Sequence, residues 1–198
     1  MDNNQLIEEP IGAHNAENDL LSDMYLSNVK KRLRALNQPP ENDRKRWVWE
    51  LIQNAKDSIS KDPNRSSVDI EIEINDDTVK FIHNGSPFTY KARLGLLYKY
   101  SKDKGGAEST GRFGTGFLTT HCLSKIVTVE GDVMDENSTH GFSVTMYRNG
   151  QSDDELLDGI KKMEASRKWY KNALGKTTFI YKIQMVNVLL VDYQCYTL

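Results

Sequence analysis

Three polar side chains recur at helical spacing in the segment WVWELIQNAKDSI, where Glu50, Asn54 and Asp57 stand four and then three residues apart. At about 100° of rotation per residue, an α-helix brings all three onto one narrow stripe. A carboxylate and an amide at the margin of a buried surface suit a hydrated Mg²⁺ and an attacking water, because hard cations prefer oxygen ligands and a general base needs partial desolvation. Taken alone, such a stripe is more often the solvated edge of a helix.

A glycine-rich turn, GRFGTGF, runs from Gly111 to Phe117 and precedes an expected helix. Glycines let the backbone approach an anion closely, and the free N–H groups at a helix start can bind phosphate oxygens. The turn lacks the GK[ST] ending of a P-loop, and no strand leads directly into it as in the dinucleotide-binding fingerprint. It therefore predicts a phosphate site of another kind, with a packing turn as the simpler alternative.

Two further segments place polar side chains at the ends of expected strands. The sequence HNGSPF opens with His83, Asn84 and Gly85, where a polar side chain and a close-approach glycine could face a base. An Asn-Gly turn is the simpler interpretation of that segment. Thr177 and Thr178 begin a late strand, where a hydroxyl could bond either a ligand or the sheet. Neither segment indicates a function alone.

Hydrophobic periodicity predicts the elements that position these side chains. Helices are expected after the glycine-rich turn and at residues 19–35, 44–60, 90–100 and 153–170. Strands are expected at residues 68–74, 79–83, 126–130, 141–147 and 177–185. This order predicts an α+β fold, a two-layer sandwich in which helices cover one face of a mostly antiparallel sheet.

The composition excludes several classes of protein. The 198 residues carry 26 Lys and Arg against 28 Asp and Glu, so a net charge of −2 gives no general attraction to nucleic acid, although basic clusters at 30–34 and 44–46 leave that partner open. The chain has no run of eighteen apolar residues and no secretory signal pattern, so we expect a cytoplasmic protein without membrane contact. Cys122 and Cys195 lack partners at metal-ligand spacing and are expected to be small buried thiols.

In this order, ELIQNAKDS, HNGSPF, GRFGTGF and the strand at Thr177 resemble the ATP-binding domain of the GHKL superfamily, which includes gyrase, heat-shock chaperone, histidine kinase and mismatch-repair ATPases. ELIQNA and GRFGTGF are similar to the forms in the ninety-kilodalton heat-shock chaperone, and HNGSPF looks more like the sacsin-type branch. The resemblance implies a Bergerat-type fold over residues 44–185. Residues 1–43 are then a helical N-terminal extension, and residues 186–198 a tail that leads toward a following domain.

The resemblance implies hydrolytic roles for the helical stripe. Glu50 is expected to be the general base that activates water, and Asn54 the residue that ligates Mg²⁺ through its side-chain oxygen. Asp57 is expected to line the adenine pocket or to support it through water. In histidine kinases the position of Glu50 is typically Asn, so the glutamate favours hydrolysis by water over phosphate transfer to a protein histidine.

The resemblance also implies contacts for the ATP phosphates and for adenine. The phosphate contacts are expected from Lys102, in a lid at 101–110, and from Gly111, Arg112, Phe113, Gly114, Gly116 and Phe117. Gly85 is expected beside adenine, and Thr177, or Thr178 after a one-residue slip, in the adenine-binding network.

One position departs from the superfamily pattern. The aspartate that accepts the adenine amino proton is replaced by His83, with Asn84 beside it and Pro87 in place of a second glycine. Adenine recognition must then come from a neutral His83 imidazole, which can accept one hydrogen bond, or from the Asn84 carbonyl, or else be weaker. Selectivity for adenine over guanine is therefore open.

Together these features predict Mg²⁺-dependent binding and slow hydrolysis of ATP by a chaperone-like domain. Lid closure is expected to drive a conformational change and to pair two protomers. One alternative is a non-hydrolysing, nucleotide-sensing interaction module, and another is a DNA-processing ATPase of the mismatch-repair type. The protein client is not predicted.

Overall fold

The structure, a computed structural model, describes residues 5–8, the single positions 26, 30 and 33, and residues 41–60, 62–98, 115–135 and 138–183. Within these residues the fold is α+β and is built on an eight-stranded sheet. None of the described helices combines the length and the apolar character that crossing a membrane requires.

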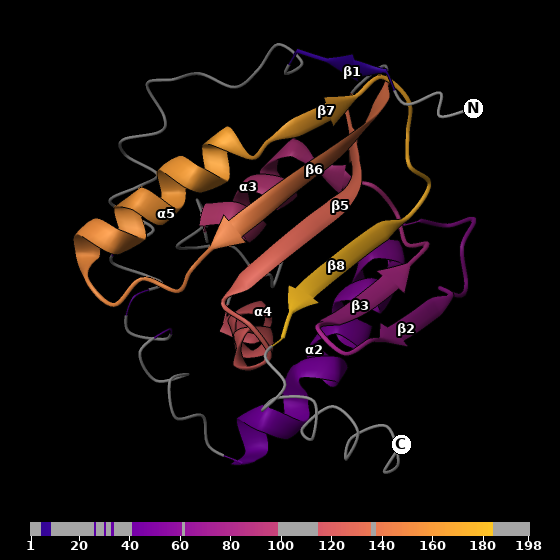
Figure 1. The fold of residues 1–198 in the computed structure, drawn as a ribbon. Helices are drawn as coiled ribbons and strands as arrows, with labels where there is room; N and C mark the ends of the chain where they lie inside the picture. The colour runs from indigo at the N-terminus through magenta and orange to yellow at the C-terminus, as the bar shows by residue number, and fades with distance from the viewer. Residues whose placement is uncertain are drawn as a thin grey trace, which may run out of the picture.

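The strands are β1 (Leu6–Ile7), β2 (Ile70–Ile74), β3 (Thr78–His83), β4 (Phe88–Thr89), β5 (Ile126–Met134), β6 (Thr139–Tyr147), β7 (Lys168–Tyr170) and β8 (Thr177–Lys182). The helices are α2 (Glu41–Ile59), α3 (Tyr90–Tyr98), α4 (Thr115–Thr119), the 3₁₀ turn η1 (Thr120–Cys122) and α5 (Asp153–Ala165). The sheet order is β1-β7-β6-β5-β8-β3-β2, and β4 also pairs with β5 (Figure 1). All pairs are antiparallel except β4 with β5, which confirms a mostly antiparallel sheet.

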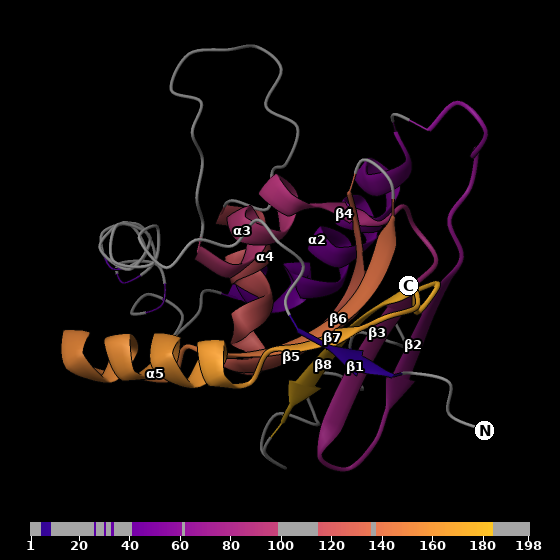
Figure 2. The same cartoon turned by 90° about the horizontal axis from the view of Figure 1, so that it is seen from above.

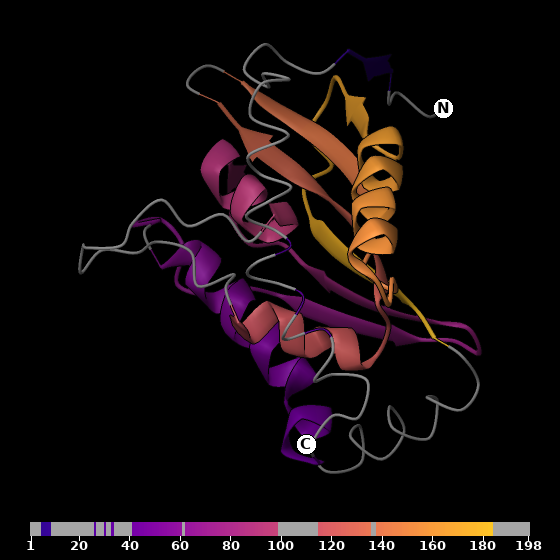
Figure 3. The same cartoon turned by 90° about the vertical axis from the view of Figure 1, so that its left-hand side faces the viewer.

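Helices α2, α3 and α4 lie on one side of the sheet (Figure 2). The alternation of side chains along each strand turns one apolar set toward them. These residues are almost fully buried: Val79, Phe81, Val127, Val129, Phe142, Val144, Phe179 and Tyr181. From the helices, Trp47, Leu51 and Ala55 of α2 complete the core. In Figure 3, α4 lies beside α2, and the two helices are in contact.

Several predicted boundaries differ from the structure. The helix expected at 153–170 ends at Ala165, and residues 168–170 form β7 between β6 and β1. The hydroxyl of Ser166 explains the stop, since it donates to the carbonyl of Met163 and accepts from the backbone N–H of Thr145. The strand expected at 126–130 continues to Met134, and α2 begins at Glu41 rather than at residue 44. Neither β1 nor β4 was predicted.

The predicted N-terminal extension takes part in the core. Leu26, Lys30 and Leu33 are helical, as expected for the helix at 19–35, whose other residues lie outside the described part. Leu33 is buried, and Lys30 forms an ion pair with Asp153 at the start of α5. Cys122 is half-buried rather than buried, and Cys195 lies outside the described residues.

Candidate functional site

Glu50 and Gly116 meet where α2 packs on α4. A Cβ atom placed on Gly116 would lie 2.2 Å from the Oε2 atom of Glu50, so only a glycine leaves this carboxylate its position. The side chain of Glu50 is 14% exposed. Two residues that were predicted from separate motifs are therefore in contact, and the carboxylate is partly desolvated, as a general base requires.

The second oxygen of Glu50 is engaged by an arginine one turn earlier on the same helix. Arg46 donates from Nη2 to Oε1 of Glu50 over 2.7 Å, and its own side chain is 61% exposed. The i, i+4 spacing of this pair is visible in the sequence, so Arg46 could have been predicted as a partner of Glu50. Because the arginine is exposed, water screens this pair and it can open at small energetic cost.

Asn54 lies one turn beyond Glu50 on α2 and is 9% exposed. Its Nδ2 atom is buried and has no acceptor within hydrogen-bond distance among the described residues. A buried polar atom without a partner is costly, so it points to a group that the fold itself does not supply. Half a turn about the last torsion exchanges the two ends of the amide, which would present the oxygen at the same place.

Asp57, the third residue of the predicted stripe, is exposed at the surface of α2. Its neighbour Ser58 is half-buried and donates to the carbonyl of Ala55 over 2.7 Å. A Cβ atom on Gly85 would lie 2.1 Å from the Ser58 hydroxyl oxygen. The absence of a side chain at Gly85 therefore allows the segment after β3 to pack against α2. Its predicted place beside adenine stays a prediction.

His83 ends β3 on the helix-covered side and is 5% exposed. Its ring stacks on Phe179 at a centroid distance of 6.2 Å and meets the edge of Phe81 at 6.1 Å. The backbone N–H of Gly85 donates to Nδ1 over 3.1 Å. Burial lowers the pKa of His83 to about 4, so the ring is neutral near pH 7 and carries its proton on Nε2.

Asn84 is held by protein groups on every side. Its side chain accepts from the backbone N–H of Asp69 over 2.9 Å and donates to the Asp69 carboxylate over 2.7 Å. Its backbone carbonyl accepts from Nη1 of Arg65. Of the two acceptors that were expected to receive the adenine amino proton, the His83 imidazole has its one acceptor nitrogen already used, and the Asn84 carbonyl already accepts one bond from Arg65.

The strand register distinguishes the two threonines. Thr177 pairs with His83 across β8 and β3, so both side chains lie on the helix-covered face, whereas Thr178 pairs with Ile82 on the opposite face. A Cβ atom on Gly131 would lie 3.1 Å from the Thr177 hydroxyl oxygen, which shows how closely this residue is enclosed. Of the two candidates, Thr177 is the one that shares a surface with His83.

Phe117 is a core residue in this structure. It is 1% exposed and packs its ring on Phe179 at 5.5 Å and on His121 at 5.4 Å. The remaining predicted contacts lie outside the described residues: Lys102, Gly111, Arg112, Phe113 and Gly114.

A buried arginine, Arg148, connects α3 with the turn that follows α4, and it was not predicted from the sequence. Arg148, which follows β6, donates to the carbonyls of Leu96 and Leu97 in α3 over 2.9 and 2.8 Å. It also donates to Nε2 of His121 in η1 over 3.1 Å. Burial, followed by the charge of Arg148, lowers the pKa of His121 well below its usual value, so the histidine is a neutral acceptor.

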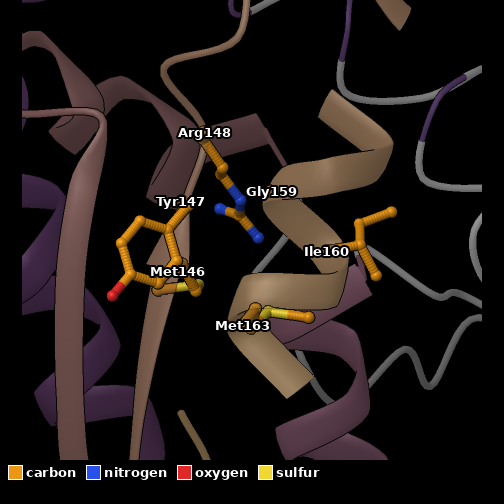
Figure 4. A pocket seen from close by; sticks show the side chains of 6 residues that line it. All are labelled: Met146, Tyr147, Arg148, Gly159, Ile160 and Met163. Carbon is orange, nitrogen blue, oxygen red and sulfur yellow. The ribbon is translucent and has the colours of Figure 1, made fainter. Parts of the chain in front are cut away.

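The arginine passes between β6 and α5. Figure 4 shows its guanidinium beside Gly159, in a pocket that is also lined by Met146, Tyr147, Ile160 and Met163. This pocket has no room for a water molecule. Arg148 is 2% exposed and belongs to the core, where it joins α3 to the turn that follows α4.

A scan against protein-family models finds no match to the chain, and a search of curated proteins finds no related sequence. Among the described residues, no three His, Cys, Asp or Glu side chains cluster so as to hold a metal ion. A cation at this surface would therefore depend on the Asn54 amide, water and ligand oxygens. Mg²⁺ in phosphate-transfer sites is bound in this way, through few protein ligands.

Proposed function

We propose that this protein binds and hydrolyses a nucleoside triphosphate with Mg²⁺, as the resemblance to the GHKL ATP-binding domain implies for ATP. The observation that carries the proposal is the contact of the Glu50 carboxylate with Gly116, one helical turn from the buried amide of Asn54. The helices on one side of an antiparallel sheet are compatible with a two-layer, Bergerat-type fold. In the same proposal, nucleotide binding pairs two protomers.

Glu50 would act as the base in this reaction. Its Oε2 atom takes a proton from water while the water oxygen bonds to the terminal phosphorus and the bond to the leaving diphosphate oxygen breaks. Arg46 holds the other carboxylate oxygen and so orients the side chain. Mg²⁺, when bound, supplies charge neutralisation at the phosphates, and the Asn54 amide oxygen is the protein group that would hold it.

A non-hydrolysing nucleotide sensor is the second candidate function. The ion pair between Arg46 and Glu50 favours it, because the arginine already occupies one oxygen of the carboxylate that would have to accept the proton. This candidate predicts that nucleotide binding raises the melting temperature while no phosphate is released.

Calorimetric titration with ATP and Mg²⁺, together with phosphate release, tests the proposal. We expect Glu50→Gln to retain binding and to lower phosphate release by about a hundredfold or more, since one general base contributes about 10²–10⁴. Asn54→Ala is expected to remove the dependence of binding on Mg²⁺. Gln53→Ala is the matched control, because Gln53 is an exposed amide on the same helix.

The outcomes separate the candidates. If neither ATP nor another nucleoside triphosphate binds in the presence of Mg²⁺, the proposed function is wrong. Binding without phosphate release, in the wild type and in Arg46→Ala, would favour the sensor. An equal loss in Asn54→Ala and Gln53→Ala would show that the amide of Asn54 has no particular role.

A further inference from the structure

The position that ends β3 presents a hydrogen-bond donor. The Gly85 N–H is a backbone donor with a fixed direction, so Nδ1 of His83 must be the acceptor in their 3.1 Å contact. The proton of a neutral ring then lies on Nε2. Among the described residues, Nε2 has no hydrogen-bond partner.

The imidazole cannot easily exchange its two nitrogens. Turning the ring over would break the bond from Gly85 and point a carbon at that N–H. The ring is also fixed by its stack on Phe179, with 23° between the planes, and by the edge contact with Phe81. The donor character of this position is therefore a property of the fold around it.

The polar groups of Asn84, the residue after His83, are engaged with other protein groups. The Asn84 carbonyl accepts from Arg65, and the Asn84 side-chain oxygen accepts from the backbone N–H of Asp69. The side-chain amide nitrogen of Asn84 is directed to the Asp69 carboxylate. A ligand donor that points at Nε2–H of His83 would lose its water partner and gain no acceptor from the ring.

We propose that His83 is a specificity-determining residue that selects a purine with a carbonyl, rather than an amino group, at position 6. This inference rests on the proposed function, in which the end of β3 faces the base. Guanine and hypoxanthine carry an acceptor, O6, where adenine carries the N6 amino donor. Nε2–H of His83 can donate to O6, whereas two donors oppose each other when adenine is bound.

Inosine triphosphate and ATP provide a matched pair of probes, because they differ at position 6 and in the proton on the adjacent N1. We expect the wild-type protein with Mg²⁺ to bind inosine triphosphate about tenfold more tightly than ATP, the effect of one hydrogen bond gained against one donor left unpaired. GTP is expected to show the same preference over ATP. Calorimetric titration measures all three dissociation constants.

The variant His83→Asp tests the residue itself. An ionised aspartate is only an acceptor, so its preference is expected to reverse toward ATP. Gln53→Ala should keep the wild-type ratio. If His83→Asp does not fold, the ratio of the wild-type dissociation constants for inosine triphosphate and ATP is sufficient to test the proposed selectivity.

The outcomes distinguish the two proposals. ATP that binds as tightly as inosine triphosphate, or more tightly, overturns the selectivity and leaves nucleotide binding intact. Failure of all three nucleotides to bind overturns the proposed function and this inference together. An unchanged ratio in a folded His83→Asp protein shows that the residue does not face position 6.

Discussion

Replacing Arg148 with methionine should destabilise the whole domain. Methionine retains much of the length of the arginine side chain but removes its charge and all of its donors. The carbonyls of Leu96 and Leu97 and the Nε2 atom of His121 would each lose the hydrogen bond that Arg148 gives them. All three groups belong to residues that are almost fully buried, at 1%, 0% and 2% exposed.

The size of the effect follows from these three contacts. Leaving a buried acceptor unsatisfied costs about 1–3 kcal/mol, so three of them cost about 3–9 kcal/mol. Removing the buried charge of the guanidinium recovers part of this cost, which leaves about 3–5 kcal/mol. We expect Arg148→Met to lower the free energy of unfolding by that amount. At a denaturant dependence of about 2 kcal/mol per molar urea, the midpoint would fall by about 1.5–2.5 M.

Urea titration followed by tryptophan fluorescence measures this change, since Trp47 and Trp169 are buried. Arg46→Met is the control, because the Arg46 side chain is 61% exposed, water screens its ion pair with Glu50, and the pair should be worth about 1 kcal/mol or less. A midpoint for Arg148→Met within about 0.5 M of the wild type would refute the view that this arginine holds α3 and η1 together.

Further predictions concern two glycines and one histidine. Gly116→Ala should lower phosphate release about tenfold at little cost in stability, because the new methyl group displaces the mobile end of Glu50, as phosphate-release assays and urea titration would show. Gly159→Ala should cost about 1–3 kcal/mol in a urea titration, since its methyl group would lie 2.3 Å from the backbone carbonyl of Tyr147. The pKa of His83 is about 4 in the fold against 6.5 when free, so its contribution to stability should be full above pH 6.5 and be lost as the pH falls toward 4. Thermal melts of the wild type and of His83→Gln over this range should therefore converge on acidification.

Helical periodicity was sufficient to place Glu50 and Asn54 together at the margin of the core. Strict alternation likewise predicted β2, the hairpin that returns from it predicted β3, and the Asn-Gly sequence located His83 at a strand end. These features depend on neighbours within a few residues. They can be predicted from a short stretch of sequence, because helices and strands each have a characteristic spacing of apolar residues.

Features that depend on distant partners could not be predicted in this way. The strand β7 has three residues, and its pairing with β6 and β1 joins segments that are far apart in the sequence. The acceptor that was expected at His83 is consumed by a backbone N–H two residues away, a geometry that no residue pattern specifies. The choice between Thr177 and Thr178 required the register of β8 on β3.

In the part of the chain that the structure describes, both edge strands of the sheet are poor templates for further pairing. At one end, β1 is only two residues long and covers β7. At the other end, β2 carries Glu71 and Glu73, and a second negatively charged strand would be repelled there. Removing residues 5–8 would expose the backbone groups of β7 beside the largely buried Trp169. The short N-terminal strand therefore protects the protein against edge-to-edge aggregation, a role in colloidal behaviour that is separate from any chemistry at α2.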